Sequence, residues 1–293
     1  MSALQGKVAV ITGGANGIGE ATARAFLASG ASVVVADLNS ELGEALAMEL
    51  KTQGHGDRVM FVPTDVGKEA EIEALIDATV ERFGQLDVLF NNAGIGGAIG
   101  PIIETEVDHW DQTFAVMVRG VFLGIKHGAR AMGNSGGSII NTASIAALSG
   151  CGGPFAYSAT KAAVVNMTLN AAVELAENNI RVNAVCPGVI FTDLMHRGRA
   201  DEAEEVTKLI QPSKMRGRPE HIASMVKYLA SDESEFITGT TQVVDGGYLA
   251  KGGLGTHPLP GVDMQPRYVG MNHGTTGKMT EVRFLDPKTD GNV

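Results

Sequence analysis

The sequence predicts an α/β fold, an open and doubly wound parallel sheet with helices on both faces. Short apolar runs recur along the chain, and they are nearly continuous rather than alternating, as in strands buried on both faces. A helix-length segment follows every run but the last, and such alternation builds parallel βαβ units. With 44% hydrophobic and 19% charged residues, the 293-residue chain has the composition of a soluble globular protein with a full core.

The expected elements alternate in chain order. The strands are expected at Val8–Ile11, Ser32–Ala36, Val59–Val62, Asp87–Asn91, Ser138–Asn141, Ile180–Val185 and Thr241–Val244. The helices are expected at Ile18–Ser29, Ser40–Gln53, Lys68–Phe83, His109–Met132, Tyr157–Asn178 and Pro219–Ala230. Because neither a linker nor a repeat interrupts this pattern, residues 1–248 are predicted to form one dinucleotide-binding and catalytic domain.

The composition changes after residue 248. Residues 249–293 are rich in Gly and Pro and show no clear hydrophobic period, which predicts an irregular C-terminal extension. Two interpretations stay open for it, a free tail and an arm that lies on a neighbouring subunit.

Charge and cysteine content narrow the function class. A net charge of −10 argues against a nucleic-acid partner. Cys151 and Cys186 have no metal-type or C-x-x-C spacing, so we expect no metal site, a reducing compartment and two small buried thiols. No signal peptide or transmembrane segment is visible, which predicts a cytoplasmic protein without a membrane partner.

A glycine-rich loop follows the first expected strand. Thr12–Gly19 carries Gly13, Gly17 and Gly19, with Asn16 and Ile18 between them. Glycines let the backbone turn sharply and approach a pyrophosphate, and the helix that begins there offers free N–H groups and a positive dipole end. A glycine pattern alone is weak, but its place between a strand and a helix predicts a dinucleotide site rather than a plain turn.

Asp37 ends the second expected strand, where a carboxylate can accept hydrogen bonds from the ribose hydroxyls of the adenosine. A carboxylate there repels the 2′-phosphate of NADP, and Leu38 and Asn39, which follow, add no positive charge. These residues favour NAD(H). Asp37 could at the same time cap the helix near Ser40.

The predicted chemistry centres on Tyr157 and Lys161. Their i,i+4 spacing places both on one face of a helix. A tyrosine with a pKa near ~10 is a poor base at neutral pH, and a neighbouring cation favours its phenolate. The pair would act as general base for alcohol oxidation and as general acid for ketone reduction. Ser144, at the end of the fifth expected strand, offers a donor to a developing alkoxide, and Ser149 and Ser158 are weaker candidates.

These motifs resemble the short-chain dehydrogenase/reductase family over residues 6–248. The matching pieces are Thr12–Gly19, Asp37, Asp65-Val66, Asn91-Asn92-Ala93-Gly94, Ser144, Tyr157-x-x-x-Lys161, and Pro187-Gly188 followed by Thr192. The resemblance implies a Rossmann fold with seven parallel strands, and a homotetramer or homodimer with an interface on helices 109–132 and 157–178. The resemblance also implies residue roles. Asp65 and Val66 would bind the adenine, and Asn91–Gly94 would line the cofactor and support the central strand. Val189 and Thr192 would bind the carboxamide of the nicotinamide, and Ser144 would polarise the substrate oxygen.

One position departs from the family pattern. The family carries an asparagine where this sequence has Met117, and that asparagine is held to bind a water linking the lysine to bulk solvent. A thioether donates no proton and accepts weakly. Another water path, a weaker activity, an introduced substitution and simple packing of Met117 all stay open.

The segments expected to frame the substrate are apolar. They offer Ile95, Ile145, Leu148, Phe155, Ile190, Phe191, Leu194 and Met195. A neutral, hydrophobic secondary alcohol or ketone, cyclic or aryl, fits such a pocket, since a carboxylate or phosphate would need an Arg clamp. Two other functions stay open: an NADPH-dependent 3-ketoacyl reductase, against which Asp37 speaks, and a non-catalytic dinucleotide-binding regulator, suggested by Met117.

Overall fold

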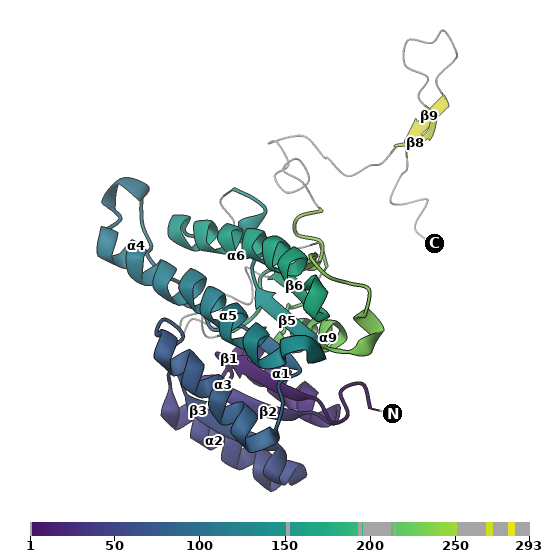
Figure 1. Ribbon diagram of the computed structural model, residues 1–293. Coiled ribbons are helices and arrows are strands. Elements are labelled where there is room, and N and C mark those ends of the chain that lie inside the picture. Colours follow the sequence, from purple (N-terminus) through teal and green to yellow (C-terminus); the bar gives the residue numbers. More distant parts are fainter. Residues whose placement is uncertain are drawn as a thin grey trace. The chain divides into compact units, whose positions relative to one another are not determined.

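The computed structural model describes residues 2–150, 153–192, 195, 212–213, 215–250, 268–271 and 281–284. The chain divides into two units, Met1–Leu249 and Ala250–Val293. The first unit is built on a seven-stranded parallel sheet in the order β3-β2-β1-β4-β5-β6-β7 (Figure 1). This architecture confirms the doubly wound fold that the alternating pattern predicts.

The elements of the first unit lie close to the expected ranges. The strands are β1 (Val8–Thr12), β2 (Ser32–Asp37), β3 (Val59–Pro63), β4 (Val88–Asn91), β5 (Gly137–Thr142), β6 (Ile180–Pro187) and β7 (Thr241–Val244). The helices are α1 (Gly17–Ala28), α2 (Ser40–Leu50), α3 (Glu69–Phe83), α4 (Val107–Phe114), α5 (Gly120–Met132), α6 (Phe155–Glu174) and α9 (Pro219–Ala230).

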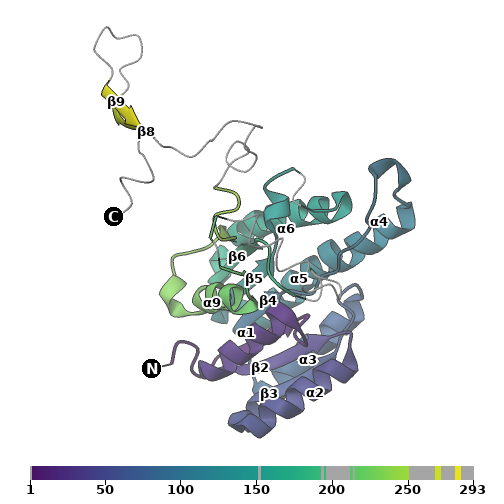
Figure 2. The same cartoon turned by 180° about the vertical axis from the view of Figure 1, so that it is seen from behind.

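Helices cover both faces of the sheet, as the two opposite views show (Figures 1 and 2). Ala9 and Ile11 of β1 belong to one core, which α1, α2 and α9 complete, whereas Val10 between them belongs to a second core with α3, α5 and α6. Every side chain of β1 is therefore buried, which explains the unbroken apolar run. Burying such side chains contributes about 1.5–3 kcal/mol each to the stability of the fold.

The expected single helix His109–Met132 is interrupted in the structure. A π-helical segment, Ala115–Arg119, separates α4 from α5. Hydrophobic periodicity cannot predict a π-helical segment, because a one-residue widening of the helix leaves the pattern almost unchanged. Such segments are frequent at functional sites. Met117 lies in the middle of this segment.

The strand order reverses between β1 and β4. The chain runs outward from β1 through β2 to β3 and then returns to place β4 on the other side of β1. The loops after β1 and β4 consequently diverge, and a crevice opens at the carboxyl ends of the strands.

The second unit contains two short antiparallel strands, β8 (Tyr268–Met271) and β9 (Glu281–Phe284), within its described residues. The Gly- and Pro-rich composition did not predict this pairing, because four-residue strands leave too little alternation to detect. In the described part of the chain, no helix combines the length and the apolar character needed to cross a membrane.

Candidate active site

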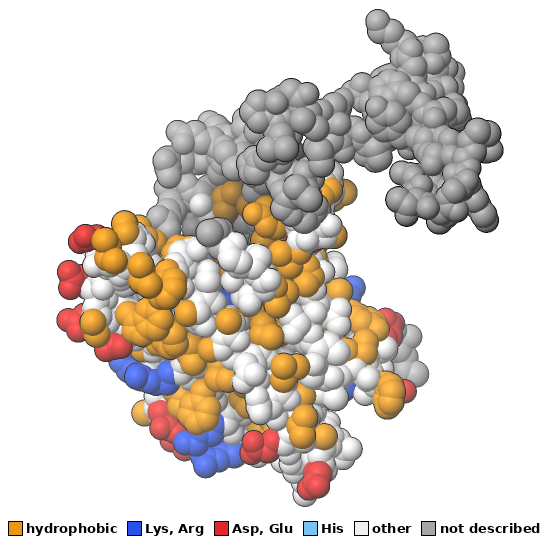
Figure 3. Space-filling model, turned by 90° about the horizontal axis from the view of Figure 1, so that it is seen from above, with side chains coloured by type: hydrophobic (Ala, Val, Ile, Leu, Met, Phe, Trp, Pro, Cys, Tyr) orange, Lys and Arg blue, Asp and Glu red, His pale blue; other side chains and the backbone are white. Residues whose placement is uncertain are grey.

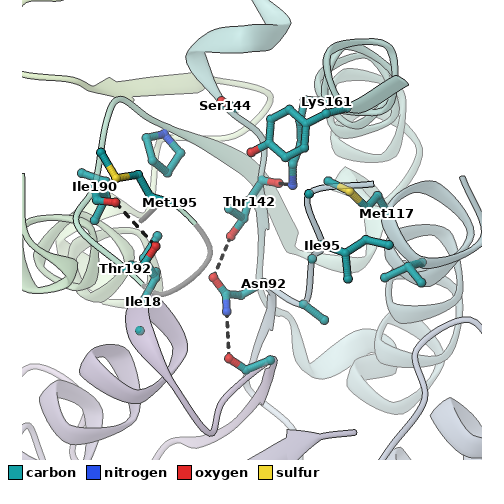
Figure 4. Close-up of a pocket in the computed structure, with 18 of the residues that line it drawn as sticks. Ile18, Asn92, Ile95, Met117, Thr142, Ser144, Lys161, Ile190, Thr192 and Met195 are labelled. Atoms are coloured by element: carbon teal, nitrogen blue, oxygen red, sulfur yellow. Dashed lines mark hydrogen bonds between the residues drawn. The ribbon is translucent and has the colours of Figure 1, made fainter. Parts of the chain in front are cut away.

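A cavity of about 590 Å³ opens at the carboxyl ends of the parallel strands. The glycine-rich loop after β1 and Asp37 of β2 line one part of it, and Ser144, Tyr157 and Lys161 line another (Figure 4). Ser144 follows β5, whereas Tyr157 and Lys161 stand in the first two turns of α6. Residues far apart in the sequence thus share one cavity.

The glycine-rich loop leaves room for a ligand against its backbone. Gly13 and Gly17 adopt φ values of +62° and +56°, which side-chain-bearing residues rarely take. A Cβ on Gly13 would lie 2.7 Å from Ala93 Cα, and one on Gly19 would lie 2.0 Å from the Gly13 carbonyl oxygen. Asn16 caps α1 by accepting from Gly17 N at 2.6 Å, so the N-terminus of this helix faces the cavity. The cradle fits a pyrophosphate.

Two backbone amides fix the Asp37 carboxylate. It accepts from Ala15 N at 3.1 Å and from Asn39 N at 3.0 Å, so it ties the glycine-rich loop to the end of β2. Asn39, and not Asp37, caps α2, because its side chain accepts from Leu42 N. The helix-capping role considered for Asp37 is therefore wrong.

Ser144, Tyr157 and Lys161 line the same cavity. Ser144 Oγ accepts from Ala146 N at 3.1 Å. Lys161 Nζ lies 5.6 Å from the Tyr157 ring centroid and donates to the Thr142 carbonyl oxygen at 2.7 Å.

Burial controls the acid–base properties of this group. It lowers the pKa of Lys161 to about 8 and raises the pKa of the Cys186 thiol, which packs behind the group, to about 11. Burial also raises the pKa of Tyr157, and the hydrogen bond from Ser144 opposes that rise. Desolvation is thus the largest influence on the pKa of Tyr157 in the absence of a cofactor.

Comparison with known proteins agrees with this geometry. The family model described as "Enoyl-(Acyl carrier protein) reductase" matches residues 13–249. Short-chain dehydrogenase reductase 3a of Arabidopsis thaliana is 39% identical over 252 residues, which cover 84% of this chain and 96% of that protein. The chain belongs to the short-chain dehydrogenase/reductase family. The family binds a nicotinamide dinucleotide and acts on alcohols and ketones.

Two further family members are similar over the same region. Cis-4-hydroxycyclohexanecarboxylate dehydrogenase of Sinomonas cyclohexanicum is 41% identical, with 83% of this chain and 97% of that protein covered. The crystal structure of levodione reductase superimposes with a TM-score of 0.79 and 35% identity, covering 84% of this chain and 99% of that one. These matches place the short-chain dehydrogenase/reductase fold in the first unit.

Most predicted cofactor residues line the cavity of this short-chain dehydrogenase/reductase. They are Gly13, Asn16, Gly17, Ile18, Asp37, Leu38, Asp65, Val66, Ala93, Gly94, Tyr157, Lys161, Pro187, Gly188, Val189 and Thr192. Gly19 and Asn91 lie outside this lining. Gly19 packs beneath the glycine-rich loop, whereas the buried Asn91 donates to Asn141 Oδ1 at 2.9 Å and joins β4 to β5.

The predicted substrate residues divide in the same way. Ile95, Ile145, Ile190 and Met195 line the cavity, and Leu194 lies outside the described residues. Leu148 and Phe155 do not line the cavity. Leu148 is 44% exposed, and the ring centroid of Phe155 lies 5.9 Å from that of Trp110. Substrate contact by these two residues stays a prediction, because the sequence did not reveal which way their side chains point.

Several lining residues were not singled out from the sequence. They are Gly96, Val116, Thr142, Gly153 and Pro154, and Met117 lines the cavity with them. Met117 is buried, and its sulfur accepts from Thr160 Oγ1 at 3.9 Å. A Cβ on Gly94 would lie 3.8 Å from Met117 Cε and 4.0 Å from Lys161 Nζ, so a thioether wall stands close to the lysine.

Proposed function

We propose that this short-chain dehydrogenase/reductase oxidises a neutral, hydrophobic secondary alcohol, cyclic or aryl, to a ketone with NAD⁺, and catalyses the reverse reduction with NADH. The observation that carries the proposal is the shared cavity, in which the glycine-rich loop and Asp37 adjoin Ser144, Tyr157 and Lys161. A bound nicotinamide would accept or donate the hydride.

Each of the three polar side chains has a distinct role in this proposal. Ser144 donates a hydrogen bond to the substrate oxygen, where negative charge develops. The Tyr157 hydroxyl moves the proton, to a ketone oxygen during reduction and from an alcohol during oxidation. Lys161, held on the Thr142 carbonyl, orients the cofactor ribose and supplies positive charge beside the tyrosine.

Asp37 supports NAD(H) rather than NADP(H). Its two backbone donors hold the carboxylate in place, and Lys161 is the only Lys or Arg among the described residues that line the cavity. A 2′-phosphate would meet this carboxylate without a neighbouring cation. The same residues speak against the alternative of an NADPH-dependent 3-ketoacyl reductase.

Apolar lining supports the substrate class. Ile95, Ile145, Ile190 and Met195 line the cavity that Tyr157 also lines, and Figure 4 labels Ile95, Ile190 and Met195 among its wall residues. The hydroxycyclohexanecarboxylate dehydrogenase relative is named for a ring-borne hydroxyl on a carboxylate, so its name supports the cyclic alcohol and not the neutral charge. We therefore place cyclic secondary alcohols first in a substrate panel.

A homotetramer or homodimer and a cytoplasmic location remain predictions. Large hydrophobic side chains are exposed on the helices expected at the interface, including Phe122 of α5 and Leu169 and Val173 of α6. The space-filling view shows hydrophobic side chains beside Asp and Glu side chains on one face of the first unit (Figure 3). Exposed apolar patches of this kind favour a protein partner.

The substitution Tyr157→Phe tests the mechanism. Because it removes the proton-transferring hydroxyl and keeps the ring, turnover of a reactive cyclic alcohol should fall by roughly 10²- to 10⁴-fold. NADH affinity, measured by fluorescence titration, should stay within about twofold of the wild type. Retained turnover in this variant would contradict the proposal.

Asp37→Ala tests the cofactor assignment. Removal of the carboxylate should lower the ratio of kcat/KM for NAD⁺ over NADP⁺, because the repulsion of the 2′-phosphate disappears. Glu41→Ala, on the neighbouring helix, serves as a charge-matched control that should leave the ratio unchanged. An unchanged ratio in Asp37→Ala would place the ribose-binding acid elsewhere.

A further inference from the structure

A chain of hydrogen bonds connects Lys161 to the glycine-rich loop across three strands. Lys161 Nζ donates to the Thr142 carbonyl oxygen at 2.7 Å, and Thr142 Oγ1 donates to Asn92 Oδ1 at 3.3 Å. Asn92 Nδ2 in turn donates to the carbonyl oxygens of Thr12 and Gly13, both at 3.1 Å. Figure 4 shows Asn92 between Thr142 and the loop, with dashed lines on both sides.

The carbonyl oxygens of Thr12 and Gly13 fix the orientation of the Asn92 side chain, and the Thr142 hydroxyl completes its hydrogen bonding. An amide presents a donor on one side and an acceptor on the other. With Nδ2 toward the two carbonyl oxygens, Oδ1 faces the Thr142 hydroxyl and accepts its proton. A flipped amide would set Oδ1 against two carbonyl oxygens, so these oxygens select the observed orientation, in which the Thr142 hydroxyl donates to Oδ1.

Thr142 thereby contacts both Lys161 and the side chain that binds the glycine-rich loop. It is the last residue of β5 and is only 8% exposed. Its carbonyl oxygen accepts from the lysine, while its hydroxyl donates toward the loop that would hold the pyrophosphate. Both groups belong to one residue, so Thr142 links Asn92 to the acceptor of Lys161.

We propose that Thr142 is a positioning residue, whose hydroxyl couples the cofactor loop to Lys161 through Asn92. The proposal rests on the proposed function in one respect, the role of Lys161 in turnover. It adds a residue to the site that neither touches the reacting atoms nor belongs to the predicted catalytic group. It also makes cofactor affinity and turnover depend on one hydroxyl.

Paired substitutions of Thr142 separate the hydroxyl from the shape of the side chain. Thr142→Val keeps the branched shape and removes the hydroxyl, whereas Thr142→Ser keeps the hydroxyl and removes a methyl group. Loss of one buried hydrogen bond corresponds to a change of roughly three- to tenfold in an equilibrium or rate constant. The valine variant should therefore raise the Kd of NADH and lower kcat by roughly this factor each, and the serine variant should restore both to within about twofold of the wild type.

A double-mutant cycle supplies a readout that a merely structural role would not move. Asn92→Ala alone should weaken NADH binding, and its effect should shrink by severalfold in the Thr142→Val background, because the link is already broken. Far-ultraviolet circular dichroism and thermal midpoints establish that the variants fold. If Thr142→Val does not fold, Thr142→Ala takes its place against the same serine comparator.

Three results would overturn the proposal: equal behaviour of the valine and serine variants, a fall in kcat with an unchanged NADH Kd, or additive effects of Asn92→Ala and Thr142→Val. The NADH titrations need no substrate. If no alcohol is oxidised by the wild-type enzyme, the proposed function fails, while the affinity comparison and the cycle still decide whether Thr142 acts on the cofactor loop.

Discussion

Lys161 carries its positive charge at a cost to stability. Because burial lowers its pKa to about 8 from the ordinary 10.5, the folded protein binds fewer protons than the unfolded chain between these two values. Stability contributed by this group therefore rises with pH from about 8 to 10.5 and is lower below that range.

Lys161→Met is expected to remove this cost together with activity. At pH 7 the variant should be more stable by up to a few kcal/mol, since each pKa unit corresponds to about 1.4 kcal/mol and the lost Thr142 hydrogen bond offsets part of the gain. The gain should shrink as the pH approaches 10. Urea unfolding of both proteins at several pH values measures it, and a pH-independent difference would show that burial does not set the lysine's charge.

Tyr157 shows the same competition between burial and charge. Sequence spacing correctly places a cation one helical turn away, yet the pKa of the tyrosine is raised because desolvation outweighs other influences in the protein by itself. In the proposed function, the positive charge of a bound nicotinamide would help to activate this hydroxyl.

Among the elements, α5 approaches β4 unusually closely at Gly124. A Cβ at this position would lie 2.0 Å from Asn91 Oδ1, so only glycine lets the helix pack over the buried Asn91–Asn141 pair. Asn141 also donates to Thr168 Oγ1 of α6 at 3.0 Å, which extends the contact to the helix that bears Tyr157.

Gly124→Ala is expected to destabilise the fold by about 1–3 kcal/mol, because α5 or Asn91 must shift. Gly150→Ala is the matched control, since a Cβ there would meet no atom within 4 Å. Chemical denaturation of both variants gives the comparison. Equal stability of the two variants would show that α5 has room at this position.

On the scale of the whole molecule, the exposed apolar side chains of α5 and α6 bear on assembly. Phe122→Asp should lower the molar mass measured by light scattering, because a charge replaces a ring that is 52% exposed on the expected interface. Leu42→Asp, at a 45% exposed position on α2, is the control that should leave the assembly unchanged. An unaltered mass in the Phe122 variant would move the interface away from these helices.

The sequence by itself determined the order of strands and helices, the glycine-rich loop, and the group of Asp37, Ser144, Tyr157 and Lys161. These features have local signals: hydrophobic period, residue spacing, and glycine where the backbone must turn. Tertiary structure alone decided that Asn91 bonds to Asn141 outside the cavity lining, that Phe155 packs toward Trp110, and that Thr142 joins Lys161 to Asn92. The reason is physical: side-chain direction, desolvation and long-range hydrogen bonds depend on neighbours that only the folded sheet brings together.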